Sequence, residues 1–336
     1  MKPSSIAPLR IAAVPFASRR GDTRDNVTRI VAALDHAARA GIALAVFPEA
    51  CLTGMGGGTR LRHADWQAIA QPLDGPLIGE VAQAVKRTGV AAGVGWIERA
   101  ADGRFFNSYV VCMPGGARFC HRKLHAGGHR IDDGSRFTVF DTQWGVRAAI
   151  LIGADNGLVE NARVIALMGA TLLLAPHCSA PRSALRGTHE AREASGEQGE
   201  GTDFGAIEAL RRAMPGRALD NGTFIVLAAG TDDDSDDAGA RGAALIVDPR
   251  GNVLADSGDR PQPFISADID RSLARARVVQ LWRASRRPAL YRPLTASATP
   301  EELAPPEPKG VTARGAVPIS FAVVKRRVKP QSGSES

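Results

Sequence analysis

One carboxylate stands at a position where it could act as a base. Glu49 follows the mostly apolar run 43–47, which predicts a buried strand that ends at a Pro- and Gly-rich loop. A low dielectric at that strand end is expected to raise the pKa of Glu49 toward values that suit a general base. The same segment is equally consistent with a Glu49 carboxylate that caps the following turn.

A lysine stands in a second charged segment. Lys123 lies between Arg122 and Leu124, with His121 and His125 close by in the sequence. A lysine at a strand end could stabilise an oxyanion during acyl transfer. Taken alone, such a segment is more commonly a solvated basic patch.

The third feature is an abrupt turn after the apolar run 148–152. That run predicts a strand buried on both faces, and apolar residues at helical spacing from 158 predict a helix after the turn. A sharp strand-to-helix turn displays its first residue, and its backbone N–H groups point at whatever binds there. The displayed residue is Gly153, which has no side chain.

Hydrophobic periodicity predicts the elements that would position these residues. Helices alternate with strands in the first half and strands dominate the later part, so we expect a layered α/β domain with mixed sheets. We assign this domain to 1–298 and a Pro- and charge-rich extension to 299–336, and we expect 179–203 to be a surface loop. The predicted strands are 9–14, 43–47, 90–97, 105–113, 137–140, 148–152, 171–175, 223–228, 242–247 and 264–267; the predicted helices are 22–41, 76–88, 158–169 and 206–213.

Composition argues against nucleic-acid binding, membrane spanning and metal binding through cysteine. The net charge is +7, but 305–336 alone contributes +4, so a solvated tail explains the charge better than a nucleic-acid groove. No apolar run is long enough to span a membrane or to form the core of a signal peptide. The four cysteines show no metal-ligand spacing, and we expect reduced thiols in a cytoplasmic protein.

Several segments, in order, resemble motifs of one enzyme family. Residues 47–54 (FPEACLTG) resemble the glutamate motif of the nitrilase superfamily of carbon–nitrogen hydrolases, and 121–125 (HRKLH) resemble its lysine motif. Residues 152–163 resemble its nucleophile motif, and the similarity spans roughly 9–294. Further matches are 169–176, 217–221, 248–251 and 286–291.

This resemblance implies a fold and a reaction. The implied fold is a four-layer α-β-β-α sandwich of the nitrilase type, and members commonly pair through outer helices into dimers or larger homo-oligomers. The implied reaction is acyl transfer on a small amide, carbamoyl or nitrile compound. A cysteine attacks the carbon, a glutamate moves the proton and a lysine stabilises the intermediate. It requires no metal or organic cofactor.

The resemblance assigns roles to particular residues. It gives Glu49 the base role and Lys123 the oxyanion role, and it places the nucleophile at Gly153. A second glutamate of the family falls loosely on His129, which could equally be an exposed loop residue. The predicted substrate contacts are Ala154, Asp155 and His177.

Three explanations of the glycine remain open. The first is an inactivating change, which glycine tolerates because it keeps the strained turn. The second is a displaced thiol: Cys178 would lie beside Gly153 if 171–175 is the parallel neighbour of 148–152, with Cys51 a weaker candidate and a buried inert thiol the alternative. The third is a non-catalytic homologue that binds a small ligand or supports a partner.

Overall fold

The chain divides into two units of very different size. The computed structural model describes residues 9–54, 63–126, 131–179, 203–232, 242–258, 262–273 and 277–295. The first compact unit is Met1–Ser285 and the second is Arg286–Ser336. In the second unit the described element is the 3-10 helix η3 (Pro288–Thr295). The guanidinium of Arg286, which precedes this helix, lies over the ring of Tyr291.

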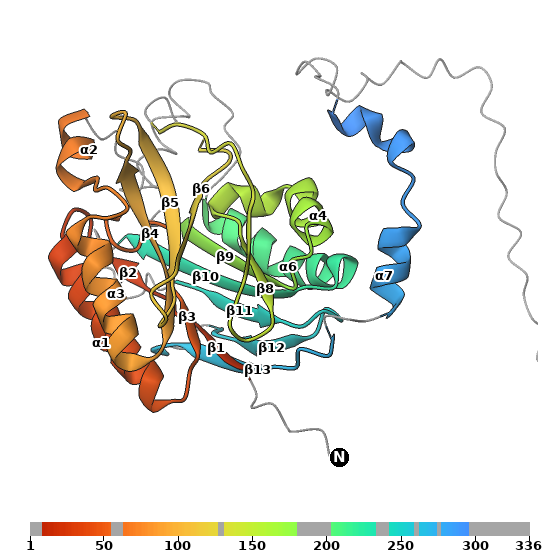
Figure 1. Ribbon diagram of the computed structural model, residues 1–336, viewed down its shortest axis with the longest axis horizontal. Helices are drawn as coiled ribbons and strands as arrows, with labels where there is room; N and C mark the ends of the chain where they lie inside the picture. Colours follow the sequence, from red (N-terminus) through yellow and green to blue (C-terminus); the bar gives the residue numbers. More distant parts are fainter. Residues whose placement is uncertain are drawn as a thin grey trace, which may run out of the picture. The chain divides into compact units, whose positions relative to one another are not determined.

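Two mixed β-sheets form the centre of the first unit (Figure 1). One has the strand order β13-β1-β3-β4-β5-β6, and the other has the order β12-β11-β10-β9-β8-β7 with β2 beside β10. The strands are β1 (Leu9–Ala13), β2 (Ala17–Ser18), β3 (Leu44–Val46), β4 (Ala91–Arg99), β5 (Phe105–Cys112), β6 (Arg118–Arg122), β7 (Thr138–Asp141), β8 (Arg147–Ile150), β9 (Leu172–Ser179), β10 (Phe224–Asp232), β11 (Ala244–Val247), β12 (Val253–Asp256) and β13 (Ile265–Ile269).

Helices cover the outer face of each sheet. In Figure 1, α1 and α3 lie against the first sheet, and α4 and α6 lie against the second. The helices of the first unit are α1 (Thr23–Arg39), α2 (His63–Ile69), α3 (Pro76–Thr88), the 3-10 helix η1 (Gly153–Gly157), α4 (Val159–Leu167), α6 (Asp203–Asn221) and α7 (Arg277–Ala284). Among the described residues, no helix is long and apolar enough to cross a membrane.

Strand alternation divides the buried residues into three layers. One face of β8, with Ala148 and Ile150, packs with the inner face of the first sheet. The opposite face, with Ala149, and Leu151 directly after the strand pack with α4 and α6, and a third cluster lies between α1, α3 and the first sheet. Side chains in a strand point alternately to opposite faces, so one apolar strand serves two layers. The predicted four-layer α-β-β-α sandwich is confirmed.

Several predicted elements are confirmed and one is wrong. Strands β4 and β5 form the predicted antiparallel hairpin, and β8 and β9 are the predicted parallel neighbours. The helix predicted to end at 213 continues to Asn221 through Pro215. The apolar period explains this, since Met214 and Ala218 extend the buried face that begins at Ile207. Residues 180–202, most of the predicted surface loop, lie outside the described residues.

The turn after β3 packs closely on strand β4. The backbone N–H of Leu52 donates to the carbonyl of Gly95, and Ala50 has a left-handed φ of 50°. A Cβ added at Gly95 would lie 2.4 Å from the backbone nitrogen of Ala50. Only a residue without a side chain therefore lets the turn that carries Glu49 approach the sheet this closely.

We expect Gly95→Ala to lower the free energy of unfolding by about 1–3 kcal/mol, because the methyl group must displace backbone atoms of the turn. The matched control is Gly115→Ala, where a Cβ meets nothing within 4 Å. Urea unfolding at neutral pH measures both variants. Equal stability of Gly95→Ala and Gly115→Ala would show that the close approach does not constrain the turn.

Candidate active site

Glu49 lies at the centre of a buried polar cluster. The residue is 3% exposed. Oxygen Oε1 accepts hydrogen bonds from Lys123 Nζ at 2.8 Å and from Asn107 Nδ2 at 2.7 Å. Oxygen Oε2 accepts from the backbone N–H of Cys178 at 3.0 Å. Both oxygens are therefore engaged, by groups from β5, β9 and the end of β6.

The backbone on both sides of Lys123 fixes where its ammonium points. The N–H of Lys123 donates to the carbonyl of Asn107, and its carbonyl accepts from the N–H of Gly134. On β6, the preceding residue Arg122 donates from Nε and Nη2 to the buried carboxylate of Glu98, at 2.9 and 2.6 Å. The lysine is 8% exposed, so the predicted alternative of a solvated basic patch is wrong.

The pKa of Glu49 is shifted in the opposite direction from the one that the sequence predicts. Burial by itself would raise the pKa of Glu49, but the charges of Lys123 and His177 and the hydrogen bonds from Lys123 and Asn107 outweigh burial, and the pKa lies below its usual value. Burial would lower the pKa of Lys123, and the Glu49 carboxylate raises it instead. The expected rise in the pKa of Glu49 is therefore wrong, because the carboxylate has a cation beside it. The pair is ionic at neutral pH.

Gly153 lies directly against this ion pair. It has a left-handed φ of 54° and begins the 3-10 turn η1 after β8. A Cβ built on Gly153 would lie 2.5 Å from Glu49 Oε2 and 2.6 Å from Lys123 Nζ. The predicted convergence of Glu49, Lys123 and Gly153 is thus present in the structure. The two charged side chains border the space that a side chain at 153 would need.

Asp155, two residues after Gly153, holds the turn in place. Asp155 is fully buried, and its carboxylate accepts from the backbone N–H groups of Leu124 and His125 at 2.9 Å each, and lies 2.8 Å from His125 Nδ1. Asp155 therefore ties the turn to the segment that carries Lys123, which differs from the substrate contact expected of it. Ala154 is exposed beside Gly153.

Strand β9 brings His177 and Cys178 to the cluster. His177 is buried and its charge would help to lower the pKa of Glu49. Cys178 is half-buried, bonds Glu49 through its backbone, and would raise the pKa of Lys123 as a thiolate. Cys51, by contrast, is buried against Gly95, and burial raises the pKa of its thiol to about 12. Cys51 is therefore a neutral packing residue.

Comparison with known proteins identifies the family. The family model for carbon-nitrogen hydrolases matches residues 10–277. The chain belongs to the carbon–nitrogen hydrolase family. It is 31% identical over 274 residues to an (R)-stereoselective amidase of a Pseudomonas species, covering 80% of this chain and 88% of that protein. It is 27% identical to the omega-amidase NIT2-B of Xenopus laevis, over 80% of this chain and 91% of that one.

Solved structures of other proteins have the same fold as this chain. Nit3 of Saccharomyces cerevisiae, a member of the nitrilase superfamily, has a TM-score of 0.63 at 17% identity, covering 83% of this chain and 96% of that chain. A double mutant of the amidase of Nesterenkonia sp. AN1 in complex with acrylamide has a TM-score of 0.62 at 18% identity, covering 86% and 98%. The resemblance to the nitrilase superfamily is confirmed.

Sequence reasoning missed one member of the cluster. Asn107 bonds both Glu49 and the backbone of Lys123, and no motif pointed to it. Its signal was a pair of polar residues, Asn107 and Ser108, inside the otherwise apolar strand β5. His129, the loosely placed substitute for a second glutamate, lies outside the described residues. In the described part of the chain, no group of three or more His, Cys, Asp or Glu could hold a metal ion.

The free energy of unfolding of this protein should depend on pH through the titration of Glu49. The folded pKa of Glu49 is below its ordinary value of 4.5, so the ionised carboxylate stabilises the fold above that pH, and this stabilisation disappears as the pH falls through the folded pKa. We expect Glu49→Gln to lower the free energy of unfolding by about 3–5 kcal/mol at pH 7, since Lys123 loses its counter-charge.

Below pH 4.5 this difference from the unchanged protein should shrink, because Glu49 is protonated first in the unfolded chain and then, as the pH falls through its lower folded pKa, in the folded protein. Urea unfolding followed by circular dichroism at a series of pH values measures the difference. A gap between the two proteins that stays constant down to acid pH would contradict an ionised Glu49 in the folded state.

Proposed function

We propose that the chain recognises a small amide, carbamoyl or nitrile compound at the Glu49–Lys123 pair, and that Gly153 prevents a covalent acyl-enzyme at the usual position. The observation that supports the proposal is that both charged groups border the space in front of Gly153. The amidase and omega-amidase relatives support a small compound with a carbon–nitrogen bond as the ligand.

The charges of the pair match the polarity of an amide. A primary amide presents a carbonyl oxygen that accepts hydrogen bonds and N–H groups that donate them. The Lys123 ammonium is a donor for the oxygen, and the Glu49 carboxylate is an acceptor for an N–H. A buried ion pair is weak support for stability, because its desolvation offsets much of its attraction. Retention of the pair therefore favours a role in binding.

Without a thiol at position 153, the site cannot form a covalent acyl-enzyme at that position. With a thiol at 153, Glu49 would take the thiol proton, the sulfur would attack the carbonyl carbon, and Lys123 would stabilise the oxyanion. The nitrogen would leave as ammonia after Glu49 returned the proton, and water would then cleave the thioester. Gly153 supplies no sulfur, so this route has no first step. Loss of a covalent nucleophile removes several orders of magnitude in rate.

A second candidate is hydrolysis through Cys178, favoured by one specific observation. Its backbone N–H donates to the same oxygen of Glu49 that lies 2.5 Å from the Cβ position of Gly153. The residue therefore borders the same space, from the neighbouring strand β9. Under this candidate, Glu49 would accept the Cys178 proton and the acyl group would form a thioester with Cys178.

Ammonia release from a panel of small amides, N-carbamoyl compounds and nitriles separates the two candidates. We expect the unchanged chain to release little ammonia and Gly153→Cys to raise the rate by about 10³-fold or more, because the thiol enters between Glu49 and Lys123. The matched control is Gly153→Ser, which has the same shape and a far weaker nucleophile.

Three further variants complete the test. In the Gly153→Cys background, Lys123→Met should abolish the gain, and Cys178→Ser should leave it intact. Activity already present in the unchanged chain, and lost in Cys178→Ser, would replace the binding proposal by the displaced thiol. Absence of both turnover and ligand-induced thermal stabilisation across the panel would contradict recognition of these compounds.

A further inference from the structure

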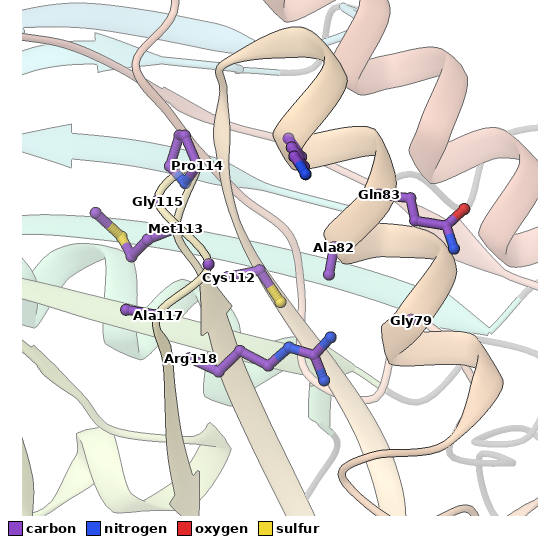
Figure 2. A pocket seen from close by; sticks show the side chains of 11 residues that line it. Gly79, Ala82, Gln83, Cys112, Met113, Pro114, Gly115, Ala117 and Arg118 are labelled. Atoms are coloured by element: carbon purple, nitrogen blue, oxygen red, sulfur yellow. The ribbon is translucent and has the colours of Figure 1, made fainter.

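A hollow separate from the Glu49–Lys123 pair opens between α3 and the turn that joins β5 to β6 (Figure 2). Its volume is about 420 Å³, within the range of about 300–1,000 Å³ typical of small-molecule sites. The hollow adjoins Cys112 at the end of β5. Asn107, which bonds Glu49, lies roughly 17 Å away along the same strand, so this is a second place at which a ligand could bind.

Cationic side chains line the hollow, and acidic ones do not. Lys86 on α3 and Arg118 on β6 are among its lining residues, which include no aspartate or glutamate. Figure 2 shows Arg118 extending from the strand toward α3. Neither cation has an ion-pair partner within the part of the chain that the structure describes. The lining therefore carries a net positive charge that no described residue neutralises through an ion pair.

The wall between the cations is uncharged. Cys112 is 1% exposed, and burial raises the pKa of its thiol to about 11, so it is neutral at physiological pH. The other lining residues are small or apolar, apart from the amide of Gln83. A ligand would thus meet two charges and one amide across a largely apolar surface, which is the usual composition of a small-molecule site.

Gly79 is a second observation, independent of charge, that supports a binding role for the hollow. It lies within helix α3, where glycine costs about 1 kcal/mol relative to alanine. Packing does not require glycine, because an added Cβ meets nothing within 4 Å, and its φ is not in the left-handed region. Close contact and backbone strain, the ordinary reasons for glycine, are therefore both absent. The missing side chain enlarges the hollow.

We propose that this hollow binds a small organic anion that carries a phosphate or carboxylate group. Arg118 would hold the anionic oxygens with its planar donor fork, and Lys86 would add a point charge. Lys86 lies in the last turn of α3, where the carbonyl end of the helix partly offsets its charge. Arg118 therefore supplies the larger share of the attraction, and the apolar wall accommodates the organic part.

Calorimetric titration with inorganic phosphate and with succinate tests the two anionic groups separately. We expect at least one of them to bind the unchanged chain, Arg118→Gln to weaken that binding at least about tenfold, and Lys86→Gln to weaken it less. The matched control is Arg99→Gln, which removes an exposed arginine at the opposite end of β4 from the residue paired with Cys112. It should leave the affinity unchanged.

A steric pair of variants keeps the test independent of charge. Gly79→Leu fills the hollow while it improves helix propensity, and Gly79→Ala improves propensity with little filling. We expect Gly79→Leu to abolish binding and Gly79→Ala to retain it, with both proteins at least as stable as the unchanged chain. Binding of phosphate alone or of succinate alone would identify the group recognised.

Three results would overturn the proposal. The first is no binding of either probe at concentrations up to about 50 mM. The second is equal binding by the unchanged chain and Arg118→Gln, which would place the anion elsewhere. The third is retained binding in Gly79→Leu, because an anion that still binds with the space filled does not occupy this hollow.

Discussion

The buried ion pair between Glu49 and Lys123 is the interaction on which the arrangement of the site depends. Each charge would be strongly unfavourable alone in the interior, so each requires the other and further hydrogen bonds. Asn107 on β5 and the backbone of Cys178 on β9 supply those bonds, from different sheets. The pair thus connects both sheets of the sandwich at one point, and the elements around it are placed to satisfy it.

Gly153 is best understood through this pair. A Cβ at that position would lie 2.5 Å from the carboxylate and 2.6 Å from the ammonium, and these two groups bond each other at 2.8 Å. The left-handed backbone of the turn is kept, and Asp155 still ties the turn to the segment that carries Lys123. The fold of a carbon–nitrogen hydrolase therefore surrounds a position that has no side chain.

The sequence predicted much of the fold because its strands are short apolar runs separated by clear turns. It also predicted that Glu49, Lys123 and Gly153 meet, since ordered motifs fix their places. It did not predict β6, in which only His121 is buried, and it missed Asn107 because a polar pair inside an apolar strand matches no motif. The direction of the Glu49 pKa shift was wrong, because burial is visible in a sequence and a neighbouring charge from a distant segment is not.

A double-mutant cycle on Glu49 and Lys123 tests the central claim most directly. The free energy of unfolding is measured for the unchanged chain, Glu49→Gln, Lys123→Met and the double variant at neutral pH. A buried, directly bonded ion pair predicts a coupling energy above about 1.5 kcal/mol, with the double variant more stable than the sum of the single losses implies. A coupling energy near zero would show that the two charges do not interact in the folded protein, and would contradict the account.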